Sequence, residues 1–137
     1  MIACGIEIKG SEAVIVILGK LDNKIENLTG EIKKVKLDND TDCRHIKSFF
    51  TTICQHFNAK SPDRIGVITR NKKGTYSGGA VSFKIETLLQ LYPGKNVTLV
   101  SPLTIKAYYK KNQIENILNF NKYQKEAYKL AYYLLNK

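Results

Sequence analysis

The chain has 137 residues with a formal net charge of +10, and 43% of its residues are hydrophobic and 25% charged. This composition excludes a disordered chain, and the length predicts a single packed domain over residues 1–137. Charged side chains interrupt the apolar stretch at residues 1–18, which excludes a membrane span or signal-peptide core there. The three cysteines lack C-x-x-C spacing, which argues against a secreted disulfide framework. We therefore expect a cytoplasmic protein.

The first part of the chain predicts three antiparallel strands. Residues 2–9 and 13–18 are rich in β-branched side chains, and the short polar connection between them contains Gly10, as in a hairpin. Residues 31–37 alternate roughly between apolar and polar side chains, which predicts a third, half-exposed strand. The simplest arrangement of the three strands is a meander.

At residue 41 the spacing of the apolar residues changes to that of a helix, which we predict over residues 41–57 with Asp40 or Thr41 as its N-terminal cap. The apolar stripe places Cys54 in the core, and we expect His56 on the surface. The two C-x-H pairs of this helix do not predict a zinc site, because residues two apart on a helix point in different directions.

The rest of the chain predicts two more strands and three helices. A buried central strand is predicted over residues 64–69, a helix from residue 81 to near Pro93 and Gly94, a last strand over residues 96–100 and a final helix over residues 123–135. Between the last strand and the final helix, Ser101 and Pro102 form a good start for a short helix, because they supply a side-chain cap and a proline in the first turn.

Three motifs carry a resemblance to known proteins: G-I-E-I-K-G-S at residues 5–11, K-G-T-Y-S-G-G-A-V-S-F-K at residues 73–84, and S-P at residues 101–102. The first is similar to the opening strand and turn of RuvC-like resolvases, and together they resemble a family of short uncharacterised bacterial proteins. With the order of elements, this implies an α/β ribonuclease H-like fold, with a five-stranded mixed sheet in the order 3-2-1-4-5 and helices on both faces. A right-handed crossover places the fourth strand beside the first.

The resemblance also implies candidate catalytic residues. In catalytic members of this superfamily, carboxylates from the first strand, the fourth strand and the last helix hold two divalent metal ions, here Mg²⁺ or Mn²⁺. Glu7 matches the first position and Glu126 approximately matches the last, so both are candidate catalytic and metal-binding residues. The fourth strand reads G-V-I-T-R over residues 66–70, where the Thr has no charge and the Arg would repel a metal ion. Glu86 on the following helix is a substitute candidate ligand.

The loop before the second predicted helix combines three cations, an aromatic residue and three glycines. Backbone amides at a helix start bind anions and glycines permit the close approach of a phosphate, so the loop predicts phosphate contact. It is not a P-loop, because Ala80 and Val81 stand where Lys and Ser or Thr are required. The alternative is a surface loop whose glycines serve only the turn. The candidate nucleic-acid-binding residues are Arg70, Lys72, Lys73, Gly74, Gly78 and Gly79.

These features predict a nucleic-acid-handling domain, which is either a catalytically reduced binder of DNA or RNA or a nuclease that depends on a divalent metal. The net charge favours an anionic partner, although the A/T-rich codons of Lys, Asn and Ile offer another source of a lysine-rich surface. The absent second carboxylate favours the binder. The alternative function is a protein-interaction or regulatory module that keeps the fold without nuclease activity, for example as a homodimer through the exposed third strand or a tyrosine-bearing helix.

Overall fold

The structure, a computed structural model, describes residues 1–70, 79–114 and 119–137. Its strands are β1 (Ile2–Lys9), β2 (Glu12–Leu21), β3 (Lys24–Asn27), β4 (Lys34–Lys36), β5 (Arg64–Ile68) and β6 (Val97–Val100). Its helices are α1 (Cys43–Lys60), α2 (Ala80–Gln90), α3 (Pro102–Lys111), the short 3₁₀ helix η1 (Lys122–Gln124) and α4 (Lys125–Asn136). Among the described residues, no helix has the length and apolar character needed to cross a lipid bilayer.

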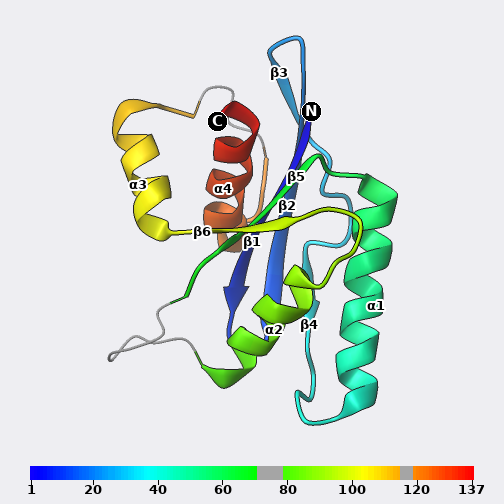
Figure 1. The fold of residues 1–137 in the computed structure, drawn as a ribbon. Helices are drawn as coiled ribbons and strands as arrows, with labels where there is room; N and C mark the ends of the chain where they lie inside the picture. Colours follow the sequence, from blue (N-terminus) through cyan, green and yellow to red (C-terminus); the bar gives the residue numbers. More distant parts are fainter. Residues whose placement is uncertain (71–78, 115–118) are drawn as a thin grey trace.

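The six strands form one mixed sheet in the order β3-β2-β1-β5-β6, and β4 also pairs with β2 (Figure 1). The strands β1 and β2 form an antiparallel hairpin, whereas β5 lies parallel to β1, and β6 lies parallel to β5. The crossover prediction is therefore confirmed, because the strand that follows α1 lies beside β1 in the centre of the sheet. The predicted number of five strands is wrong by one, at the edge next to β2.

That edge consists of two short strands in place of the single third strand predicted over residues 31–37. A two-residue turn at Asp22 and Asn23, with φ of 51° and 66°, joins β2 to β3 and pairs Leu21 with Lys24. Positive φ at both turn residues is typical of a type I′ turn, whose twist suits a hairpin. The strand β4 then pairs with the opposite end of β2, where Lys36 lies opposite Glu12.

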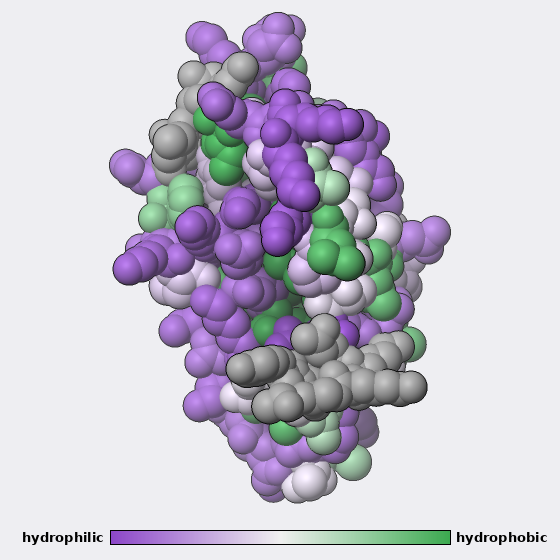
Figure 2. All heavy atoms as spheres, turned by 90° about the vertical axis from the view of Figure 1, so that its left-hand side faces the viewer, coloured by the Kyte–Doolittle hydropathy of each residue, from purple (hydrophilic) through white to green (hydrophobic). Residues whose placement is uncertain are grey.

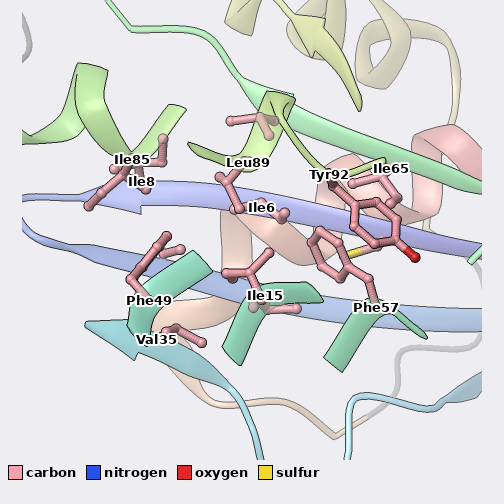
Figure 3. Packing of buried hydrophobic residues seen from close by; sticks show 14 of the residues in the cluster. Ile6, Ile8, Ile15, Val35, Phe49, Phe57, Ile65, Ile85, Leu89 and Tyr92 are labelled. Carbon is pink, nitrogen blue, oxygen red and sulfur yellow. The ribbon is translucent and has the colours of Figure 1, made fainter. Parts of the chain in front are cut away.

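The alternation of side chains along the strands separates two hydrophobic clusters, one on each face of the sheet. Helices α1 and α2 lie on one side and α3 and α4 on the other (Figure 1). Ile6 and Ile8 of β1 pack with Phe49 of α1 and with Ile85 and Leu89 of α2 (Figure 3). On the opposite face, buried residues of β1 and β2 pack against α4. The sheet therefore has helices on both faces, as predicted.

Two predictions for the first helix are wrong. Its N-terminal cap is Asp42, not Asp40 or Thr41, because the Asp42 carboxylate accepts a hydrogen bond of 2.8 Å from the amide of Arg44. His56 is buried, with 5% of its surface exposed, because it lies three residues after Ile53 and seven after Phe49, on the side of α1 that faces the sheet. The start of α3 agrees with the prediction, since Ser101 is its cap and Pro102 its first residue.

Candidate functional site

The structure brings Glu7 of β1 and Glu126 of α4 to one cavity of about 590 Å³. The cavity lies where the carboxyl end of β1 meets α3 and the first turn of α4. The other residues that line it are Ile68, Pro102, Ile105, Lys106, Tyr109, Lys110 and Lys129. The two carboxylates are therefore neighbours, although they come from opposite ends of the described chain.

A close contact between β1 and α4 positions this pair. A Cβ atom on Gly5 would lie 2.3 Å from the carbonyl oxygen of Ala127 and 2.6 Å from the amide nitrogen of Ala131. Only a glycine at this point of the strand lets the helix backbone come so near. Because Glu7 shares a strand face with Gly5 and Glu126 precedes Ala127, the contact also brings the two acidic residues together.

The surroundings of Glu7 act on its charge in opposite directions. Burial raises the pKa of the Glu7 carboxyl above its ordinary value, and the nearby Glu126 raises it further, whereas Lys9 and Arg70 lower it. The Lys9 ammonium lies 3.5 Å from Oε1 of Glu7 and also donates a hydrogen bond of 3.1 Å to the carbonyl of Tyr123. The net result is a carboxyl group that is easier to protonate than a solvated glutamate.

Three lysines form the cationic side of the cavity. Lys106 and Lys110 are four residues apart on α3, so they share one face of the helix, and Lys129 comes from α4. The Lys129 ammonium lies 5.2 Å from the centre of the Tyr109 ring, and the Tyr109 hydroxyl donates a hydrogen bond of 2.6 Å to the Lys129 carbonyl. Figure 2 shows this side of the molecule, where hydrophilic residues predominate around a hollow with hydrophobic atoms at its base.

Two other predicted site residues, Glu86 and Gly79, do not line the cavity. Glu86 is 8% exposed and belongs to α2, which packs on the opposite face of the sheet from α4, so it does not line the cavity. Thr69 follows β5, and its amide donates to the carbonyl of Val100. Gly79 is the cap residue of α2 and has no side chain to complete the cap. The predicted phosphate contacts Lys72, Lys73, Gly74 and Gly78 lie outside the described residues.

Arg70 lies near the carboxylate pair, at the junction of β1 and β5. Its guanidinium Nη1 donates a hydrogen bond to the carbonyl oxygen of Ile8. Its charge lowers the pKa of Glu7, so the two side chains are within electrostatic reach. The resemblance implied a carboxylate near the end of this strand, and the chain instead supplies a cation there.

This set of residues does not fit a centre for two divalent metal ions. Two such ions need several carboxylates to offset their charge. The cavity offers two carboxylates and three lysines, with Lys9 and Arg70 beside Glu7. Within the described ranges, no three His, Cys, Asp or Glu side chains form a group that could hold a metal ion. The assignment of Glu7, Glu86 and Glu126 as metal ligands stays a prediction that this geometry does not favour.

Sequence reasoning did not single out Lys106, Lys110 or Lys129. In a chain this rich in lysine, no single lysine stands out by its type. One signal was present, because Lys106 and Lys110 are four residues apart on a helix that starts at the end of a strand, where ligands of α/β proteins commonly bind.

Comparison with known proteins gives a family and a fold. The model of the family described as "Protein of unknown function (DUF3010)" matches residues 1–134. Among curated protein sequences, none matches the chain.

Solved structures are similar over nearly the whole chain. RuvC of Thermus thermophilus has 14% identical residues and a TM-score of 0.70, with 96% of this chain and 91% of that chain covered. RuvC of the same organism in complex with a Holliday junction substrate has 13% identity and a TM-score of 0.66, with 96% and 90% covered. A fowlpox virus resolvase with Holliday junction DNA has 16% identity and a TM-score of 0.51, with 96% and 88% covered. The chain therefore has a RuvC-like ribonuclease H-like fold, as predicted.

Proposed function

The chain belongs to the DUF3010 family of unknown function, and because this membership brings no activity with it, we propose from the site itself that the domain binds the phosphate backbone of nucleic acid without cutting it. The observation that carries the proposal is the placement of Lys106, Lys110 and Lys129 around one cavity beside the Glu7 and Glu126 pair. The binding surface consists of this cavity and the exposed side of α3.

The charge arrangement supports an anionic ligand. Lys106 and Lys110 are both exposed, and like charges four residues apart on a helix repel each other by a few tenths of a kcal/mol, about as much as an opposite pair attracts. A phosphate between them would relieve that repulsion and release counterions from the nucleic acid. Tyr109 adds an aromatic ring under the Lys129 ammonium, a combination typical of surfaces that contact sugar or base as well as phosphate.

The structural neighbours support nucleic acid as the class of partner. Both the Thermus RuvC and the fowlpox virus resolvase have structures in complex with Holliday junction DNA. Branched DNA is therefore the first ligand to test on this chain. A nuclease activity is less well supported than binding, because the second carboxylate position carries no acid and cations flank Glu7.

The test is a salt titration of binding. Fluorescence anisotropy with labelled four-way junction, duplex and single-stranded DNA in EDTA should show affinity that falls steeply as salt rises. The double variant Lys106→Ala with Lys110→Ala should reduce the slope of log affinity against log salt for duplex DNA by about two, roughly 0.9 for each phosphate that the variant no longer neutralises. The matched control removes Lys47 and Lys95, which are exposed and lie away from the cavity, and should leave the slope almost unchanged.

Two results would contradict the proposal. Wild-type protein that binds none of the DNA or RNA probes at low salt would favour the alternative of a protein-interaction module, and sedimentation would then show whether the chain forms a homodimer. An equal decrease of slope in the α3 variant and in the control would show that binding follows net charge and that the cavity has no special part in it.

A further inference from the structure

Arg70 occupies a defined position where the pairing between β1 and β5 stops. The parallel register runs from Ala3 opposite Arg64 to Ile6 opposite Val67, so the carbonyl of Ile8 lies beyond the last backbone pair. A buried carbonyl without a partner is costly, and the Arg70 guanidinium supplies the missing donor. The hydrogen bond holds a positive charge at the carboxyl end of β1, one residue beyond Glu7.

The charge held there acts on the carboxylate pair. Burial, the largest influence, and Glu126 disfavour the ionised form of Glu7, whereas Lys9 and, to a smaller extent, Arg70 favour it. The Glu7 side chain is 20% exposed, so the interaction is only partly screened by solvent. Two atoms at this junction, Oε1 of Glu7 and Nε of Arg70, are buried without a hydrogen-bond partner among the described residues. Oε1 of Glu7 still forms an ion pair of 3.5 Å with Lys9, and Arg70 acts on the same carboxylate through its charge.

We propose that the Arg70 guanidinium provides, beside Glu7, the positive charge that a divalent metal ion would otherwise provide, so that the cavity excludes divalent ions and takes a phosphodiester without metal. An arginine remains charged at any pH of interest, and its planar group matches a phosphate. A dication that entered beside Glu7 would meet the fixed positive charge of Arg70, which weakens its binding. The phosphodiester part of this inference rests on the proposed function, and the exclusion of metal does not.

The experiment measures Mn²⁺ binding by electron paramagnetic resonance, in the absence of nucleic acid. Arg70→Asp should bind Mn²⁺ at least about tenfold more tightly than the wild type, because the change removes a repelling charge and adds a third carboxylate. At the Mn²⁺ concentrations at which Arg70→Asp binds, the wild type should show no binding. The matched control Arg70→Lys keeps the positive charge and should bind no Mn²⁺. Adding Glu7→Gln to Arg70→Asp should abolish the binding gained.

Folding of the variants is verified by circular dichroism, because Arg70→Asp removes the donor to the Ile8 carbonyl. Arg70→Gln retains an amide donor without the charge, so it decides the question if Arg70→Asp does not fold, and it should gain weaker Mn²⁺ binding that depends on Glu7. The proposal is overturned if wild-type protein binds Mn²⁺ through Glu7, or if the folded charge-removing variants gain no binding.

A second measurement separates this inference from the proposed function. DNA affinity of the wild type should not depend on Mg²⁺ for its existence: at matched ionic strength it should be at least as high in EDTA as in Mg²⁺, because Mg²⁺ competes for the phosphates. DNA binding that requires Mg²⁺ would overturn the role of Arg70 and leave nucleic-acid binding intact. Absence of DNA binding under both conditions would overturn the proposed function, while the Mn²⁺ result would still decide whether Arg70 excludes metal.

Discussion

The backbone of Gly5 in β1 lies directly against the backbone of Ala127 in α4. A Cβ atom at residue 5 would come within 2.3 Å of the Ala127 carbonyl oxygen, a distance that real Cβ contacts essentially never show. The last helix is thus seated on the first strand without an intervening side chain. The separation of Glu126 from Glu7 depends on this contact.

Replacing Gly5 by alanine should therefore be strongly destabilising. The new methyl group meets backbone atoms on a packed helix, so α4 must move, and we expect a loss of about 3 kcal/mol in the free energy of unfolding measured with urea. Gly19→Ala is the matched control, because its Cβ would meet the end of the Leu28 side chain, which can rotate away. Equal losses of stability in the two variants would show that the close backbone contact between α4 and β1 is not the cause of the destabilisation.

Stability should decrease as the pH falls through the range in which His56 titrates. Burial lowers the pKa of His56 below its ordinary value of 6.5, and the charge of Lys60 lowers it further. Between the folded and unfolded pKa values the unfolded chain binds more protons, so stability is full above 6.5 and is lost as the pH falls through the folded value. The urea midpoint should decrease from pH 7 to pH 5, and by less in His56→Gln. An equal decrease in the variant would assign the effect to other groups.

The cap of α1 should depend on Asp42 and not on the neighbouring Asp40. Asp42→Ala removes the acceptor for the Arg44 amide, and we expect the melting temperature to fall by roughly 4 °C. Asp40 instead forms an exposed ion pair with Lys84 at 2.9 Å, which contributes little at ordinary salt. Asp40→Ala should therefore change the melting temperature much less. A larger fall for Asp40 than for Asp42 would contradict the assignment of the cap.

The glycine-rich loop gives a prediction that rests on sequence alone, because Lys72 and Lys73 lie outside the described residues. Replacing both by alanine should weaken binding to all DNA sequences alike and reduce the slope of log affinity against log salt by about two. Thermal stability should barely change. An unchanged slope with the fold intact would show that the phosphate surface is confined to α3 and its cavity.

The central strands could be predicted because burial dictates their composition. β1, β2 and β5 are apolar runs whose side chains are mostly buried, and the ends of the predicted ranges lie within three residues of the observed ones. β3 was missed because its residues are exposed or half-exposed and carry no apolar alternation. Its turn did leave a signal, since Asp22-Asn23 is a dipeptide that accepts positive φ, and Lys24 to Asn27 follow it directly.

Local sequence does not predict which residue acts as a helix cap or ligand where several neighbouring residues could take the same role. The run D-N-D-T-D at residues 38–42 offers three aspartates within five residues, and only the backbone path shows that Asp42 is the cap. The site has the same difficulty on a larger scale. Resemblance indicated Glu7 and Glu126, and the spacing of Lys106 and Lys110 was a local signal, but the grouping of these lysines with Lys129 depends on how α3 packs against α4.

Helix α4 contacts β1, β2 and β5, and its buried residues make up much of the hydrophobic cluster on that face. The helix cannot detach by itself, because its departure would expose this cluster to water. Detachment of α4 is therefore a global event, and the amide hydrogens in the middle of the helix, at Leu130 and Ala131, should exchange with solvent only through complete unfolding. Any ligand held between Glu126 and α3 then protects the entire domain against heat and proteolysis, by an amount fixed by its concentration relative to its dissociation constant.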